Sequence, residues 1–158
     1  MYKVEVEKGN LSFSAAHFIS FGGKCERLHG HNYAVSVSLE GNLTDDRYVF
    51  DFVELKKTIR RICDRLDHHF LLPMRSQHLD IKEANEEWEI RFENRRYVFP
   101  AEDVLVLPVD SITAERLAEY VCGQLIDSVT EQERLSLTSI TVGVEEAPGQ
   151  TAFYQHSF

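Results

Sequence analysis

Two histidines separated by a single glycine, His29 and His31, are the residues whose types and spacing are best suited to chemistry. Alternate side chains of a strand point to one face, so these imidazoles would project together, and Gly30 leaves the opposite face uncrowded. His17 lies upstream in a segment with strand-like spacing and offers a third imidazole. Three imidazoles without a fourth protein ligand describe a catalytic zinc site with an open position. The alternative is an ordinary half-buried histidine pair.

A cysteine and an Asp-His pair accompany the histidines. Cys25 stands four residues before His29, and a thiolate is a suitable base where a neighbour lowers its pKa. Asp67 and His68 end a helical pattern, where a carboxylate can fix the tautomer of an imidazole and raise its basicity. Alone, such a pair often only ends a helix. Beside a thiol and a metal site, an acid–base role is favoured, and a purely structural zinc would need none of these groups.

Composition limits the class of protein. The chain has 158 residues, of which 43% are hydrophobic and 27% are charged, as in one soluble globular domain spanning 1–158. Its net charge of −9 argues against nucleic-acid binding, which needs a basic face. Three scattered cysteines do not form a disulfide framework, which favours a reducing cytoplasm. The sequence has no signal-peptide pattern and no long apolar run, so we expect neither export nor membrane spanning.

Hydrophobic periodicity predicts the elements that must position these residues. Alternation over 2–19, with a bulge or turn at 9–10, and over 31–43 predicts two long strands. A helix of about 15 residues follows Asp51, and a second, capped by Ser111, reaches about residue 128. Two strands follow it, at 137–144 and 151–154. The order ββααββ predicts an α+β fold with a four-stranded antiparallel sheet and two helices on one face. Residues 73–108 form an insertion, with a hairpin around 86–107 and a short apolar strand at 104–108.

Taken together, the motifs resemble the 6-pyruvoyl-tetrahydropterin synthase family, which includes the 6-carboxy-tetrahydropterin synthases of queuosine biosynthesis. The motifs are Phe13-Ser14-Ala15-Ala16-His17, Cys25-x-x-x-His29-Gly30-His31-Asn32-Tyr33, Asp51-Phe52-x-x-Leu55-Lys56, Leu66-Asp67-His68-His69, Thr113-x-Glu115 and Glu146. They occur in the family's order over most of the chain, and only the insertion lacks a counterpart in the short members. The resemblance implies a tunnelling fold, in which ββααββ subunits join their sheets into a barrel, and a homo-oligomer, with a hexamer favoured.

The resemblance also implies a reaction and a cofactor. The substrate would be 7,8-dihydroneopterin triphosphate, which a lyase converts to a 6-substituted tetrahydropterin with triphosphate or acetaldehyde elimination. Zinc would be held by His17, His29 and His31. Cys25 would be the general base, and Asp67 and His68 would form a proton relay with it. The resemblance allows these groups to meet across a subunit boundary.

Two further positions match the family's substrate-binding residues. Glu146 would anchor the pterin ring and count with the relay, and Thr113 would contact the pterin. Glu145 is the rival carboxylate, and strand alternation puts the two on opposite faces, so only one can enter the site. The triphosphate must meet positive charge; Lys24 and Arg27 flank the cysteine, although simple loop solubility explains them equally well.

The product stays open at this stage. Three residues between Cys25 and His29 resemble the spacing of the 6-carboxy-tetrahydropterin synthases, so that product is favoured over 6-pyruvoyl-tetrahydropterin. Glu26 also fits a variant group in which a glutamate replaces the cysteine and the product is 6-hydroxymethyl-dihydropterin for folate. Both residues are present here, so a dual activity is conceivable. A non-catalytic pterin or purine binder on the same fold is the remaining alternative.

Overall fold

The computed structural model describes all residues from Met1 to Phe158 and divides the chain into two compact units. Unit 1 consists of Met1–Phe13, Asn32–Arg65 and Ala114–Phe158. Unit 2 consists of Ser14–His31 and Leu66–Thr113. No helix has both the length and the apolar character that crossing a membrane requires.

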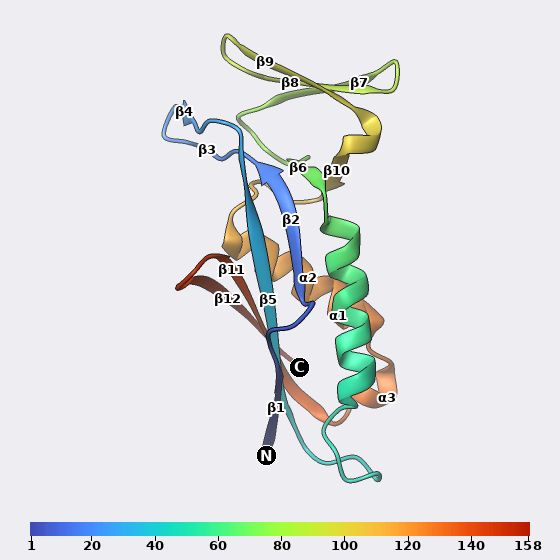
Figure 1. Ribbon diagram of the computed structural model, residues 1–158. Coiled ribbons are helices and arrows are strands. Elements are labelled where there is room, and N and C mark those ends of the chain that lie inside the picture. Colours follow the sequence, from blue (N-terminus) through green and yellow to red (C-terminus); the bar gives the residue numbers. More distant parts are fainter. The chain divides into compact units, whose positions relative to one another are not determined.

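Unit 1 is built on an antiparallel sheet. Its strands are β1 (Tyr2–Val6), β5 (His29–Gly41, from Asn32 onward), β11 (Leu137–Ala147) and β12 (Gln150–Ser157). β5 pairs with β1 and with β11, and β12 pairs with β11 (Figure 1). The four antiparallel strands confirm the predicted sheet. The long strand predicted over 2–19 is divided at the turn allowed there: β1 and β2 (Ser12–His17) are separated by a turn in which Lys8 and Gly9 have positive φ.

Two amphipathic helices complete the core of unit 1. α1 (Phe52–Leu66) has the predicted length of 15 residues, and α2 (Ala114–Ser128) packs on β11 and β12. Their apolar stripes are fully buried, as are alternate residues of β5; they include Leu55, Ile59, Leu117, Val121, Val35, Val37 and Leu39. The predicted cap at Ser111 is wrong, because α2 begins three residues later, directly after Thr113. A short α3 (Glu131–Arg134) begins with a capping box of Thr130 and Glu133 and is a helix that was not predicted.

Unit 2 contains short strands and the insertion. β6 (His69–Pro73) pairs in parallel with β2 on one side and with β10 (Val104–Leu107) on the other. β3 (Ser20–Phe21) and β4 (Lys24–Cys25) form a small hairpin. The inserted segment forms a separate antiparallel sheet of β7 (Asp80–Ala84), β8 (Glu87–Phe92) and β9 (Arg95–Pro100), and a 3₁₀ turn at Ala101–Asp103 follows it. The predicted hairpin and apolar strand are thus present, and β7 is an additional strand.

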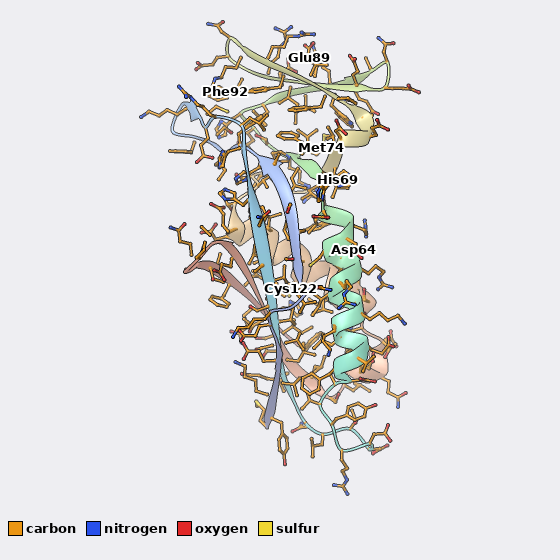
Figure 2. All side chains as sticks on the ribbon, viewed as in Figure 1. Asp64, His69, Met74, Glu89, Phe92 and Cys122 are labelled. Atoms are coloured by element: carbon orange, nitrogen blue, oxygen red, sulfur yellow. The ribbon has the colours of Figure 1, made fainter.

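The core of unit 2 joins the inserted sheet to the ends of β2 and β6. Phe18 stacks on Tyr97 of β9 with ring centroids 4.9 Å apart, and Phe70 of β6 stacks on Phe99 at 4.5 Å. Ile90 of β8 is fully buried in the same cluster. Figure 2 labels His69 and Met74 near β6, and Glu89 and Phe92 along β8. The insertion is therefore packed directly behind the segment that carries His17.

Candidate metal and catalytic site

The three predicted histidines converge within unit 2. One ligand atom of each of His17, His29 and His31 lies within 4.8 Å of the others. Each pair of rings meets edge to face, with centroids 4.7 to 5.1 Å apart. Because β2 ends at His17 and β5 begins at His29, the site lies where these two strands meet in unit 2. The group is suited to hold a metal ion.

Backbone carbonyls fix the tautomers of two of these rings. His17 is fully buried and donates its Nδ1 hydrogen to the carbonyl of Ile112 at 2.8 Å. His29 donates its Nδ1 hydrogen to the carbonyl of Arg27 at 2.7 Å. A carbonyl can only accept, so in each neutral ring the Nε2 lone pair is left for a metal, which is the usual arrangement behind histidine ligands.

The distance between those two lone-pair atoms tests whether a metal fits. Nε2 of His17 and Nε2 of His29 lie 3.2 Å apart. Two nitrogens about 2.0–2.1 Å from one tetrahedral ion would be separated by about 3.3 Å. Two neutral acceptors have no reason to approach so closely without a cation or a proton between them. The donor set and its spacing therefore fit a tetrahedral metal site.

Gly30 allows β2 and β5 to approach closely between the ligands. A Cβ atom at this position would lie 2.9 Å from the carbonyl oxygen of Ala15 and 3.6 Å from the Cα of Ala16. Both neighbours are backbone atoms, so a side chain would force the strands apart. The absence of a side chain, noted in the sequence, is required by the packing of the two strands that carry the ligands.

The Cys25–Glu26 segment lies beside the metal group. Glu26 is held by Ile19 on both sides, because its N–H donates to the Ile19 carbonyl at 2.9 Å and its Oε2 accepts from the Ile19 N–H at 3.2 Å. That same Oε2 lies 3.9 Å from Nε2 of His29. The carboxylate of Glu26 therefore faces the metal-binding nitrogen and is, beside Cys25, a second candidate reactive group.

The thiol of Cys25 is half-buried, and its environment is mixed. Burial raises its pKa, and the Glu26 carboxylate adds a smaller effect in the same direction. The Arg95 guanidinium opposes them through a hydrogen bond and its positive charge. The balance is a raised pKa, so one chain by itself does not bring this thiol near neutrality. The sequence-based interpretation made thiolate formation conditional on His68 or the metal, and no hydrogen bond joins Cys25 to His68 within the chain.

The Asp67–His68 pair is fixed against Ser14. Asp67 Oδ1 accepts from the Ser14 N–H at 2.7 Å, and its Oδ2 accepts from Nδ1–H of His68 at 2.7 Å. The backbone N–H of His68 also donates to the Ser14 carbonyl at 2.7 Å. The hydrogen bond from the Ser14 amide is the main reason that the pKa of Asp67 lies below its ordinary value. The carboxylate stays ionised and orients an exposed imidazole whose Nε2 is free to exchange a proton.

The two remaining predicted residues lie in different units, and each is half-buried. Thr113 is the last residue of unit 2 and precedes α2, whereas Glu146 belongs to β11 in unit 1. The pairing of β11 with β12 shifts between Glu145 and Ala147, so Glu146 is the extra residue of a β-bulge. A bulge interrupts the alternation on which the sequence argument about the two glutamates rested. Glu145 accepts the Gly149 N–H at 3.1 Å and so closes the β11–β12 turn.

Two residues near the site carried no signal in the sequence reading. Ser14 appears there only as part of a motif, and Arg95 only within the hairpin predicted around 86–107. The structure extends the Arg95 side chain from β9 to the carbonyls of Cys25 and Glu26. The only hint is that Arg95 shares its strand face with Tyr97 and Phe99, which are apolar partners of the core.

Comparisons with known proteins agree with this geometry. The family model described as 6-pyruvoyl tetrahydropterin synthase matches residues 5–157. A Methanocaldococcus jannaschii protein named a putative 6-carboxy-5,6,7,8-tetrahydropterin synthase is 36% identical over 92% of this chain and 90% of its own. A Pyrococcus furiosus dihydroneopterin monophosphate aldolase is 40% identical over a shorter stretch, 38% of this chain and 51% of that protein.

The crystal structure of Plasmodium vivax 6-pyruvoyl tetrahydropterin synthase is 40% identical, with a TM-score of 0.95 over 99% of this chain and 98% of that one. Such coverage means that the inserted sheet has a counterpart there. Two further structures of that protein carry alanine or cysteine in place of a glutamate called a catalytic residue.

The fold and the histidine group together define an enzyme with a tunnelling fold and a site suited to a metal ion. The chain belongs to the 6-pyruvoyl tetrahydropterin synthase family, and it is a lyase of that family.

Proposed function

We propose that this chain is a zinc-dependent lyase that converts 7,8-dihydroneopterin triphosphate to a 6-substituted tetrahydropterin, with 6-carboxy-tetrahydropterin favoured over 6-pyruvoyl-tetrahydropterin. The observation that carries the proposal is the 3.2 Å approach of two Nε2 atoms whose Nδ1 hydrogens are bound to carbonyls. The name of the Methanocaldococcus jannaschii relative supports the product. We further propose a cytoplasmic homo-oligomer, a hexamer being favoured, that serves queuosine biosynthesis.

The metal site would be formed by His17, His29 and His31. Bound zinc would supply Lewis-acid polarisation of the substrate's side-chain oxygens, which acidifies the neighbouring C–H. Three imidazoles would fill three of the four coordination positions of a tetrahedral zinc ion. The fourth position would stay open for substrate. The carbonyls of Ile112 and Arg27 hold two of the rings in the required tautomer before substrate arrives.

Proton transfer would be the task of Cys25, Asp67 and His68. Cys25 would take the proton of the activated carbon as a thiolate, so its raised pKa must be offset in the assembled, loaded enzyme. Asp67 would hold His68 with its Nε2 towards solvent or a neighbouring group, ready to pass a proton on. Cys25 and His68 are not hydrogen-bonded within one chain. We therefore propose that the relay forms across a subunit boundary.

Glu146 would anchor the pterin ring. An ionised carboxylate accepts a ring N–H and an exocyclic amine hydrogen together, which is a strong two-point contact. The use of Glu145 in the β11–β12 turn favours Glu146 for this task, and a bulged position re-aims its side chain. Thr113 is proposed as a second pterin contact. Lys24 and Arg27 are the proposed contacts for the triphosphate.

A second reaction is favoured by the position of Glu26. Its Oε2 lies 3.9 Å from Nε2 of His29, so a carboxylate base stands beside the proposed metal position. A carboxylate there is suited to take a hydroxyl proton in a retro-aldol cleavage, which would give 6-hydroxymethyl-dihydropterin. The catalytic glutamate of the Plasmodium vivax protein and the aldolase name of the Pyrococcus furiosus relative support this route.

Product analysis tests both reactions. Purified zinc-loaded protein is incubated with 7,8-dihydroneopterin triphosphate, and the pterins and the released small molecules are identified by mass spectrometry. We expect 6-carboxy-tetrahydropterin as the main product. We expect Cys25→Ala to remove it and to retain 6-hydroxymethyl-dihydropterin, and Glu26→Gln to have the reverse effect.

The controls separate chemistry from binding. Glu89→Gln alters a carboxylate that bonds only arginines of the inserted sheet, so it should leave both products unchanged. A fully zinc-loaded wild type that binds the substrate without converting it would contradict the proposed lyase reaction and favour a pterin-binding role.

A further inference from the structure

The side chain of Arg95 contacts both residues on which the proposed chemistry depends. Its Nη1 donates to the carbonyl of Cys25 at 2.7 Å and to the carbonyl of Glu26 at 3.1 Å. The positive charge of the guanidinium also acts on the neighbouring Cys25 thiol, where it lowers the pKa against the larger effect of burial. Arg95 is therefore bound to the consecutive peptide units that carry both reactive side chains, although it lies about 70 residues away in sequence.

Packing of the inserted sheet determines where this side chain points. Alternate residues of β9 face one side, so Arg95, Tyr97 and Phe99 share a face. Tyr97 stacks on Phe18 and Phe99 stacks on Phe70, which fixes that face against the core of unit 2. The β8–β9 register, with Phe92 opposite Arg95 across a two-residue turn, then leaves Arg95 no freedom to change face.

The Cys25–Glu26 segment needs such a contact because it has little regular structure of its own. β4 has only two residues and ends at Cys25. Ile19 holds the N–H and the carboxylate of Glu26, and Arg95 binds the carbonyls on the other side of the chain. A guanidinium that binds two successive carbonyls fixes the orientation of the peptide between them, and with it the directions of both side chains.

We infer that Arg95 is a positioning residue for the Cys25–Glu26 pair, and that the inserted β7–β9 sheet is thereby a working part of the active site. This inference rests on the lyase reaction proposed above. It gives the insertion a role beyond packing: its aromatic face places one guanidinium behind the two candidate bases. It also makes the orientation of Cys25 and Glu26 depend on a residue of the inserted sheet.

Three variants test the inference. Arg95→Ala removes the contacts, and Arg95→Lys keeps a positive donor that reaches fewer acceptors. Arg96→Ala is the matched control, since the neighbouring Arg96 is exposed and bonds Glu89 within the inserted sheet. We expect Arg95→Ala to lower kcat by about 10- to 100-fold with KM changed less than about threefold, because misplaced catalytic groups affect turnover more than binding.

We expect Arg95→Lys to recover part of kcat and Arg96→Ala to behave as wild type. Zinc content should stay the same in all three variants, because Arg95 does not contact the histidines. Equal kcat values for Arg95→Ala and Arg96→Ala would overturn the inference. So would a loss of kcat in Arg95→Ala that Arg95→Lys does not relieve at all while zinc content falls.

Two measurements keep this test independent of the lyase activity. The pH profile of Cys25 alkylation by iodoacetamide, followed by peptide mass spectrometry, should move to higher pH in Arg95→Ala and not in Arg96→Ala. Cys63 and Cys122 are fully buried and will not compete. Amide hydrogen exchange at Glu26 should become faster in Arg95→Ala, with exchange in β8 unchanged. An unchanged alkylation profile and unchanged exchange would refute the contact even if no pterin is ever turned over.

Discussion

The two units of this protein are stabilised in different ways. Unit 1 is an antiparallel sheet and two helices whose aliphatic residues recur at strand and helix spacing and are fully buried. Unit 2 holds its reactive groups by side chain–backbone hydrogen bonds between residues far apart in sequence: 95 residues for His17 and Ile112, 70 for Arg95 and Cys25, and 53 for Asp67 and Ser14. Substitutions in unit 1 should therefore cost mainly stability, and substitutions in unit 2 mainly chemistry.

Loss of a metal ligand should give the largest effect on chemistry. His29→Ala removes a ligand whose side chain is 40% exposed, so the fold loses little. We expect bound zinc to fall to near zero and turnover to drop by about a thousandfold or more, because metal polarisation contributes several kcal/mol to the transition state.

His78→Ala, an exposed histidine outside the site, should keep both zinc and turnover. Zinc is measured by elemental mass spectrometry. If His29→Ala unfolded on losing its zinc, the metal would be structural and the contrast between the units would fail.

A core truncation in unit 1 should show the opposite pattern. Ile59 is fully buried in α1, so Ile59→Ala leaves a cavity and should lower the free energy of unfolding by about 2–5 kcal/mol. Turnover per folded molecule should not change. Val53→Ala on the same helix is the control, because Val53 is 66% exposed and should cost little. Urea unfolding followed by circular dichroism measures the free energy of unfolding of both variants. A large drop in kcat for Ile59→Ala would show that stability and chemistry are not divided between the two units.

Two glycines offer a matched pair, one in each unit. Gly30→Ala places a methyl group 2.9 Å from the Ala15 carbonyl, a backbone atom that cannot move away, so the ligand strands must separate. We expect zinc affinity to fall by about 10- to 100-fold, as for other changes behind metal ligands. Gly143→Ala meets the Ser36 hydroxyl and the exposed Phe153 ring, which are side chains able to turn aside. Zinc titration should therefore find Gly143→Ala unchanged; equal effects would argue against strand approach as the cause.

Asp67 should give the smallest effect on stability, visible as a pH dependence of the free energy of unfolding. Its pKa is lowered in the folded state, mainly by the Ser14 amide, so it adds stability above the unfolded pKa and loses it as pH falls through the folded value. The stability difference between wild type and Asp67→Asn should be present at pH 6 and vanish below the ordinary aspartate range. Its size should stay below about 1 kcal/mol, since the side chain is 38% exposed. A difference that grows as pH falls would contradict this assignment.

The same contrast explains what the sequence could predict. The helix over 52–66, the antiparallel strands and the histidine group follow from periodicity and spacing, and the structure has them. The third inserted strand was missed because residues 80–84 are mostly polar and exposed on both faces. The bulge at Glu146 was missed because it depends on a partner strand, which alternation along one strand cannot report.

The side chain–backbone contacts of unit 2 could not be predicted from the sequence for a different reason. A guanidinium bound to carbonyls, or a carboxylate bound to an amide, uses backbone atoms that every residue has. Arg95 and Ser14 therefore leave no mark in the sequence that distinguishes them from solvent-exposed residues of the same type. Only the register of β9 and the end of α1 show where these side chains reach.

The paired hydrogen bonds between Ile19 and Glu26 have a practical consequence. They close the segment between them at its base, and Arg95 holds the same end through the carbonyls of Cys25 and Glu26. Gly22 and Gly23 form the tip of this segment, with positive φ and open space around each Cα. A short tag inserted there would leave these contacts, and with them the reactive carboxylate, in place.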